Sequence, residues 1–106
     1  EIYNNVVQNT KVEGICFWSC GNNMVYNNIF NNTDNPWFDH DPGSVLYPNT
    51  WNVTKANFMG GNYWTRPSGH GFSDTCVDKN SDGICDSRYN LDLKGGELNV
   101  DYMPLS

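Results

Sequence analysis

The hydrophobic and polar positions along the chain follow short runs rather than a helical period. The stretch IYNNVVQNT at 2–10 recurs as VYNNIFNNT at 25–33, offset by 23 positions. In both copies, short β-branched or aromatic runs are separated by pairs of asparagine, and no segment shows an apolar residue every three to four positions. A period in the low twenties with such runs is typical of a solenoid built from short strands. The pattern therefore predicts an all-β chain of stacked coils.

Asparagine is unusually frequent, with seventeen residues in the chain, and the corners of such coils explain why. A corner often takes the backbone through positive φ, which asparagine tolerates better than most residues. Its amide can also bond the asparagine stacked one coil away, at a strand spacing of about 4.8 Å. We therefore interpret nearly every asparagine as architectural.

The 106 residues are expected to form one domain, because a chain of this length does not support two separate cores. Residues 1–33 hold the repeat coils. Three prolines and a glycine within 34–49 predict an irregular excursion, 50–64 returns to strand-like composition as a final coil, and 65–106 is a loop-rich cap. We expect about two to three coils, the first of which exposes an uncapped row of strand edges.

An acidic loop, CVDKNSDGICD at 76–86, alternates carboxylate and amide side chains at the spacing of a calcium-binding loop. Calcium prefers six to eight hard oxygen ligands, and a glycine such as Gly83 permits the chain to reverse around the ion. Without a cation, carboxylates at this spacing would repel one another. We therefore predict a calcium site and expect the ion to hold the fold rather than perform chemistry. The predicted ligands are Asp78, Asn80, Asp82, the carbonyl of Ile84, and Asp86.

The acidic loop departs from the EF-hand motif at its last ligand. The twelfth position of that motif, normally a bidentate glutamate, is Tyr89 here, and no helical pattern flanks the loop. We expect a shortened calcium loop that recruits its last ligand from elsewhere, and the sequence leaves Asp74, Asp92 and Asp101 open as candidates. An acidic turn without an ion and a magnesium site are the alternatives.

Four cysteines in a small, aromatic-rich chain favour disulfides and an oxidising compartment. A bridge between Cys76 and Cys85 would close a small ring around the acidic loop. Cys16 would then pair with Cys20, which requires a coil corner between them, because four residues of extended strand span roughly 13 Å. Spacing alone does not fix the pairing, and it matches no common zinc pattern.

Three motifs in the second half of the chain carry a resemblance to a known family: GGNYW at 60–64, GFSDTCVDKNSDGICDSRYNL at 71–91 and VDYMPL at 100–105. With the Asn-rich coils, they resemble the C-terminal part of archaeal and bacterial surface proteins with parallel β-helix repeats. These repeats also occur in NosD-like periplasmic proteins and in carbohydrate-binding or sugar-hydrolase domains. The resemblance implies a right-handed parallel β-helix outside the cytoplasm but no single activity.

Charge and composition exclude several function classes. The net charge is −6 and the six Lys and Arg residues are scattered, which argues against a nucleic-acid partner. No apolar run approaches the roughly 20 residues that cross a bilayer, and an export signal is expected upstream of Glu1. His40 between Asp39 and Asp41 is a catalytic candidate, which Arg66 and Lys55 could join in a site. No coherent catalytic set surrounds it, so we predict a surface loop and no enzyme.

The leading hypothesis is a calcium-stabilised structural module of an extracellular or cell-surface protein. It would form filaments or homo-oligomers through its exposed coil edges, or stack on upstream coils. Asn31 and Asn52 begin sequons for N-glycosylation in an exported chain.

Two alternative functions remain open. A carbohydrate-binding or polysaccharide-cleaving β-helix domain would use Trp37 and Trp51 as surface aromatics, whereas Trp18 and Trp64 are expected in the core. A NosD-like copper-delivery module would need soft or imidazole ligands. The available candidates for copper are His40, His70, Met24, Met59 and Met103.

Overall fold

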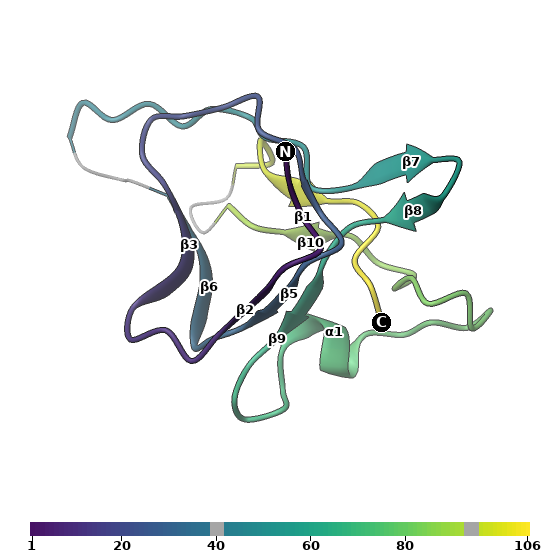
Figure 1. Ribbon diagram of the computed structural model, residues 1–106. Coiled ribbons are helices and arrows are strands. Elements are labelled where there is room, and N and C mark those ends of the chain that lie inside the picture. Colours follow the sequence, from purple (N-terminus) through teal and green to yellow (C-terminus); the bar gives the residue numbers. More distant parts are fainter. Residues whose placement is uncertain (39–41, 93–95) are drawn as a thin grey trace.

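The computed structural model describes residues 1–38, 42–92 and 96–106, and it consists almost entirely of short strands joined by turns (Figure 1). The all-β class predicted from the absence of a helical period is therefore confirmed. In chain order the elements are β1 (Ile2–Tyr3), β2 (Val6–Gln8), β3 (Glu13–Phe17), β4 (Val25–Tyr26), β5 (Ile29–Asn31), β6 (Asp34–Phe38), β7 (Val53–Lys55), β8 (Phe58–Gly60), β9 (Tyr63–Thr65), α1 (Phe72–Thr75), β10 (Tyr89–Asn90) and β11 (Val100–Asp101).

Strands one coil apart pair in parallel; β1–β4 and β2–β5 keep the 23-residue offset of the sequence repeat, whereas β3–β6 pairs at an offset of 21. β1 pairs with β4, β2 with β5, and β3 with β6, which brings Tyr3 opposite Tyr26. β9 continues the middle sheet on the far side of β5. The sequence repeat is thus one turn of a coil, and the chain folds as a short parallel β-helix. The right-handedness implied by the resemblance stays a prediction.

The inside of the coils is filled by aromatic side chains from successive turns. Phe30, Trp51 and Trp64 are at most 1% exposed. The ring centroids of Phe30 and Trp64 stack at 4.8 Å, and Trp51 meets Phe17 edge-on at 5.2 Å. Large rings bury much apolar area and gain further from these geometries, so this aromatic column stabilises the stack of coils. The core position predicted for Trp64 is confirmed.

Two tryptophans lie on the opposite side from their predicted positions. Trp51, expected as a surface aromatic, is 0% exposed, and its Nε1 donates to Asn99 Oδ1 at 3.0 Å. Trp18, expected in the core, is 67% exposed. Successive residues of a strand face opposite sides, and Phe17 takes the inward position at the end of β3, which leaves Trp18 outside.

Asparagines occupy the corners between strands, as expected. Asn4, Asn9, Asn22 and Asn27 all have φ between 52° and 60°, in the left-handed region. Asparagine enters this region at less cost than most residues, because its short polar side chain bonds the local backbone. In the pairs Asn4–Asn5 and Asn27–Asn28, the first asparagine therefore turns the chain, and the second bonds the next coil.

Stacked asparagines join the coils through ladders of hydrogen bonds that all run in one direction. Asn5 donates its backbone N–H and its Nδ2 to Asn28 Oδ1, at 3.0 Å each. Asn28 donates the same two groups to Asn62 Oδ1, at 3.2 and 2.9 Å. Between the ladder side chains, each Oδ1 therefore accepts from the coil before it, and each Nδ2 donates to the Oδ1 of the coil after it. The Nδ2 of Asn28 also donates back to the carbonyl of Ile2 in the preceding coil.

A second ladder has the same construction and the same direction. Asn23 donates its N–H and Nδ2 to Asn49 Oδ1 at 3.1 and 2.9 Å, and Asn49 donates to Asn99 Oδ1 at 3.0 and 3.1 Å. Because the donors of both ladders point toward the C-terminal end of the stack, the two ends of the helix are chemically different. A third ladder runs through Thr10, Asn32 and Asn35.

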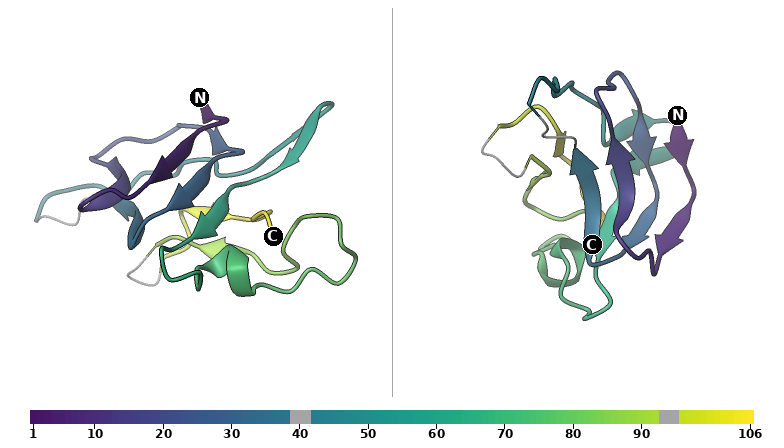
Figure 2. Two further views of the ribbon diagram at one scale, coloured as in Figure 1. Left: turned by 60° about the horizontal axis from the view of Figure 1, so that its bottom comes forward. Right: turned by 90° about the vertical axis from the view of Figure 1, so that its left-hand side faces the viewer.

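The later segments differ from the layout expected for 34–49 and 50–64. The first begins with a regular strand, β6, that pairs with β3. The second contains the antiparallel hairpin β7–β8, which projects from the stack (Figure 1). After β9, the helix α1, the acidic loop and the antiparallel pair β10–β11 cover one end of the stack, and β1 lies at the other (Figure 2).

Asn62 occupies the middle of the first ladder and offers a sharp test of it. It is 0% exposed, its Nδ2 donates to the carbonyls of Val25 and Trp51, and its Oδ1 accepts from Asn28. Asn62→Ala leaves these buried groups without partners and should lower the free energy of unfolding by about 3 kcal/mol. The exposed Asn57→Ala control should change it by less than about 0.5 kcal/mol. Denaturant titrations giving equal, small changes would contradict a structural role for the ladder.

Candidate functional site

Both long ladders end at an aspartate supplied by the C-terminal segment. Asn62 donates its N–H to Asp101 Oδ2 at 2.9 Å, and Asn99 donates its N–H to Asp92 Oδ2 at 2.9 Å. The two Nδ2 groups follow the same direction, at 3.4 Å to Asp101 and 3.3 Å to Asp92. An ionised carboxylate only accepts hydrogen bonds, so it takes the last donors of a ladder and requires no further acceptor beyond itself.

Asp101 is fully buried and surrounded by donors. Besides Asn62, Trp64 Nε1 donates to its Oδ2 at 2.9 Å and the N–H of Met103 donates to its Oδ1 at 3.1 Å. A side chain at Gly61 would overlap this carboxylate, so the glycine leaves the space in which it sits. Burial raises the pKa of Asp101 to about 6, while the donors from Trp64, Asn62 and Met103 oppose the rise.

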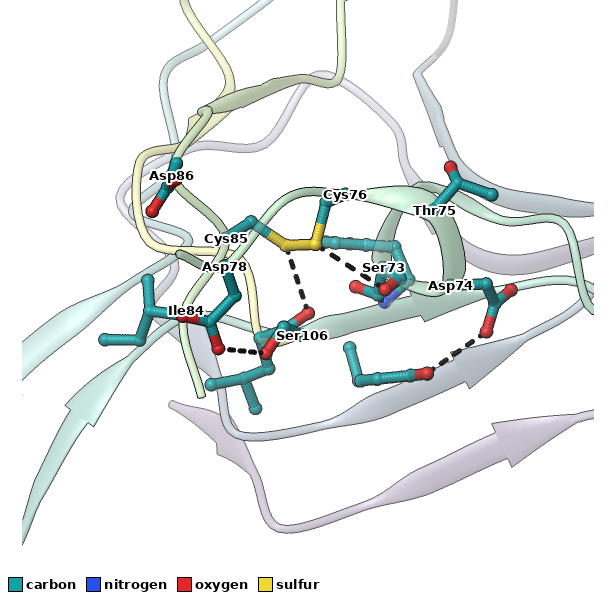
Figure 3. Close-up of a disulfide and its surroundings, with 12 residues drawn as sticks. Ser73, Asp74, Thr75, Cys76, Asp78, Ile84, Cys85, Asp86 and Ser106 are labelled. Atoms are coloured by element: carbon teal, nitrogen blue, oxygen red, sulfur yellow. Dashed lines mark hydrogen bonds between the residues drawn. A yellow bond between two sulfur atoms is a disulfide. The ribbon is translucent and has the colours of Figure 1, made fainter. Parts of the chain in front are cut away.

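The acidic loop folds back onto the last residues of the chain beside a disulfide (Figure 3). The disulfide joins Cys76 and Cys85. Ser106 Oγ donates to Asp78 Oδ2 at 2.9 Å, and the N–H of Cys85 donates to the carbonyl of Pro104 at 2.8 Å. The loop is therefore tied to the segment that directly follows β11.

The oxygen-bearing side chains of the acidic loop gather around one turn. Asp78 accepts the N–H of Asp82 at 3.2 Å and that of Gly83 at 3.0 Å, and Asn80 Nδ2 donates to Asp82 Oδ2 at 2.9 Å. Desolvation raises the pKa of Asp78, but hydrogen bonds from Ser106 and the loop amides outweigh it and lower the pKa below its usual value. These bonds hold the loop in shape and favour the ionised form of Asp78.

A metal site at the acidic loop stays a prediction. Among the residues that the structure describes, no three His, Cys, Asp or Glu side chains form a group that could hold a metal ion. The three candidates for the last ligand are engaged elsewhere. Asp74 accepts from Thr65 Oγ1 at 2.6 Å, and Asp92 and Asp101 end the ladders. A calcium ion here would draw on the amide oxygen of Asn80 and on carbonyls besides the carboxylates.

The expected disulfide between Cys16 and Cys20 is not formed, and both side chains are exposed. Cys16 faces outward on β3, because Phe17 beside it faces the core. Cys20 follows a corner at Ser19, whose φ is 46°. The corner required for the pairing thus exists, but no disulfide joins the two cysteines across it.

The predicted surface aromatics and the sequons have mixed outcomes. The ring of Trp37 lies 6.4 Å from that of the exposed Trp18, so these two form an aromatic pair on the outside of the coils. Asn31 and Asn52 are half-buried, and Asn52 Oδ1 accepts the N–H of Tyr102 at 3.2 Å. Glycosylation at both stays a prediction.

The catalytic candidate around His40 (39–41) lies outside the described residues.

A surface groove beside the β7–β8 hairpin was not predicted from the sequence. The rings of Tyr3 and Tyr26 form one wall and stack at 5.2 Å with 3° between their planes. Lys55 Nζ donates to the Tyr26 hydroxyl at 3.0 Å and lies 4.6 Å from the ring centroid. Asn4 and Asn27 also line the groove. The signal was in the repeat, because both tyrosines occupy the same position in its two copies.

In-register parallel coils, joined by amide ladders and covered at one end, define a module of the parallel β-helix class. A family model described as periplasmic copper-binding protein (NosD) matches residues 1–69. The chain belongs to this family, which confirms the resemblance to NosD-like proteins. No curated protein and no solved structure gives a significant match. Among the helices of the described residues, none is long and apolar enough to cross a membrane.

The described residues do not fit a copper ion, the metal named in the family description. Copper favours clustered thiolate, thioether or imidazole ligands. His70 is exposed, with Nδ1 2.8 Å from the carbonyl oxygen of Ser68, and the exposed Met59 lies on β8. In the described segments no imidazole or thiol belongs to a metal-holding group. The remaining imidazole, on His40, lies outside those segments.

The buried carboxylate of Asp101 predicts a stability that falls as the pH rises. Its pKa of about 6 in the folded chain exceeds the usual 3.8, so the folded state binds the proton more tightly. This contribution is fully present below about pH 4 and is lost as the pH rises through about 6, by roughly 3 kcal/mol in all. Asp101→Asn should therefore flatten the profile of unfolding free energy between about pH 4 and pH 7.

Asp92→Asn is the matched control, because it alters the other ladder end and keeps the Asp101 carboxylate in place. Asp74 and Asp78 act in the opposite sense: hydrogen bonds outweigh desolvation and lower their pKa values, so their contributions are lost only at pH values below about 4. Urea titrations across the range measure the slopes. A slope in Asp101→Asn equal to that of the unaltered chain would show the assignment to be wrong.

Proposed function

We propose that this chain is the end-closing module of a parallel β-helix outside the cytoplasm, with a structural rather than a catalytic role. The observation that carries the proposal is that both long ladders end at acceptor-only carboxylates, Asp92 and Asp101. A stack of coils otherwise ends in free donors and strand edges, which recruit further strands. A segment that accepts the last donors stops the stack at that end.

A calcium ion in the acidic loop would lock this closing segment. Asp78, Asn80 and Asp82 share one turn, and a disulfide brackets them. The loop bonds the chain end through Ser106 and through the bridge between Ile84 and Leu105, directly after β11. An ion bound in the loop would therefore restrain the strand that presents Asp101. The disulfide and the periplasmic family description support an oxidising location outside the cytoplasm.

Carbohydrate binding is the second candidate function, and the groove beside the β7–β8 hairpin favours it. The stacked rings of Tyr3 and Tyr26 offer apolar contact, and Lys55 and the corner asparagines offer hydrogen bonds. This groove replaces the platform expected around Trp51, because Trp51 is buried in the core.

Calcium should raise the stability of the chain if the acidic loop binds it. At a hundredfold excess over Kd, the free energy of unfolding should rise by about 2.7 kcal/mol relative to a chelator. Asp82→Ala should abolish this shift. Asp34→Ala, which removes an exposed carboxylate on β6, should retain it. Thermal melts with and without chelator, together with metal quantification, measure the effect, and the absence of a shift would remove calcium from the proposal.

Hydrogen exchange in the same samples separates binding from closing. The backbone amides of Asn62 and Asn99 donate to the terminal carboxylates, so calcium should slow their exchange. The amide of Asn5, at the other end of the first ladder, should be unaffected. A melting shift without protection of Asn62 and Asn99 would describe an ion that binds the loop without closing the helix.

A glycan array tests the second candidate. Binding through the groove should be lost in Tyr3→Ala and weakened in Lys55→Ala, because these changes remove the stacking face and the cationic donor. Trp37→Ala, which alters the aromatic pair elsewhere on the coils, should leave it intact. Binding that is lost only in Trp37→Ala would place the site on the aromatic pair, and no binding at all would eliminate this function.

A further inference from the structure

The turn between β9 and α1 presents a cation and an imidazole, Arg66 and His70, on one short segment (Figure 1). The N–H of Gly69 donates to the carbonyl of Arg66 at 2.8 Å, which closes the turn. Gly71 packs so closely against β9 that a side chain there would overlap the backbone of Thr65. Both ends of the turn are therefore anchored, and the two functional side chains extend from a fixed backbone.

Arg66 and His70 line a cleft of about 210 Å³. Its other walls include Asn35 on β6, Phe72 on α1 and Tyr89 on β10. The rings of Phe72 and Tyr89 stack at 4.4 Å, so one wall is aromatic. The cleft thus combines a guanidinium, an imidazole and a phenol hydroxyl, which come from segments far apart in the sequence.

In the described part of the chain, no ion pair or hydrogen bond engages the Arg66 guanidinium. Asp74, on α1 beside the turn, is occupied by neutral donors. Its Oδ1 accepts from the Tyr63 hydroxyl at 3.1 Å, and its Oδ2 accepts from Thr65 Oγ1 at 2.6 Å and from the N–H of Gly71 at 2.7 Å. The guanidinium is therefore available to a ligand, and its geometry matches a carboxylate, which it binds through two parallel hydrogen bonds.

His70 and Tyr89 add hydrogen-bonding groups of a different kind. The Nδ1 of His70 lies 2.8 Å from the carbonyl oxygen of Ser68, and because a carbonyl only accepts, Nδ1 carries a proton. In the neutral ring, Nε2 is then an acceptor for a hydroxyl group. Burial raises the pKa of Tyr89, and the guanidinium of Arg66 opposes the rise, so these two side chains are neighbours. The Tyr89 hydroxyl, which no described residue bonds, can donate or accept.

We propose that this cleft binds a small acid with a hydroxyl beside its carboxylate, either a free hydroxy acid or a sugar acid. Arg66 takes the carboxylate through two hydrogen bonds, His70 Nε2 accepts from the neighbouring hydroxyl, and the Tyr89 hydroxyl bonds either group. Pockets for drug-sized ligands hold about 300–1,000 Å³, so a cleft of 210 Å³ fits a smaller molecule. The inference goes beyond the closing role, which does not use this cleft.

Other anions fit the cleft less well than a hydroxy acid. A plain carboxylate leaves His70 Nε2 without a donor, and sulfate would bring only acceptors to it. Acceptors that face each other without a donor are unfavourable. The chain also carries a net charge of −6, which repels a dianion more strongly than a monoanion.

Calorimetric titration of the 106-residue chain with small probes tests the ligand class. Glycerate and galacturonate, a hydroxy acid and a sugar acid, should bind at least about tenfold tighter than acetate, galactose or sulfate. Acetate lacks the hydroxyl, galactose lacks the carboxylate, and sulfate offers only acceptors. Tighter binding of galacturonate would identify a sugar acid as the source of the carboxylate, and tighter binding of glycerate would identify a free hydroxy acid.

Substitutions assign the binding to named groups. Arg66→Gln should weaken the binding of both acids at least about tenfold, because it removes the charge and the paired donors. His70→Ala should remove the preference for glycerate over acetate and leave acetate binding unchanged, which a merely structural role would not do. Arg88→Gln is the matched control and should bind as the unaltered chain does, because Arg88 pairs with Glu97 and does not line the cleft.

Tyr3→Ala should also leave the affinity unchanged, because it alters the groove beside the β7–β8 hairpin, so the two sites are tested separately. The altered side chains are exposed, and melting temperatures check that each variant folds. Three results would overturn the inference: no binding of either acid, binding of acetate or sulfate as tight as that of glycerate, or full affinity in Arg66→Gln.

Discussion

A ladder asparagine in this fold uses every hydrogen-bonding atom of its side chain. Asn28 accepts two bonds from Asn5 on its Oδ1, and its Nδ2 donates to Asn62 and to the carbonyls of Ile2 and Tyr26. A buried amide is tolerated only when it is bonded in this way, and an amide that loses a partner retains the desolvation cost. The ladder therefore fixes both the residue type at each rung and the spacing of the coils.

Because the bonds between ladder side chains all run in the same direction, the two ends of each ladder need different chemistry. An asparagine at the closing end would carry donors that require yet another acceptor, whereas a carboxylate only accepts. Asp101 takes its bonds from Asn62, Trp64 and Met103, and burial raises its pKa. The closing end thus satisfies the last amides by burying a carboxylate, and the disulfide-linked loop beside it holds the covering strand in place.

The sequence was informative where the chain repeats and much less so where it does not. The shared positions of Tyr3 and Tyr26 predict the parallel register, and the Asn pairs predict the corners. Trp18 and Trp51 lie outside the repeat. Whether each side chain points into the core or toward solvent depends on where the neighbouring strand ends, and no local sequence pattern specifies this. Asp101 was noticed only as an acidic residue, because its partner Asn62 is 39 positions away in a different kind of segment.

The extent of the family match bears on which properties the chain shares with NosD proteins. The match spans residues 1–69, which contain the coils, the ladder amides up to Asn62 and the groove, but not the acidic loop or the terminal carboxylates. Within the described part of that region no side-chain group could hold a metal ion. The match therefore describes an architecture, and the same architecture can carry different sites.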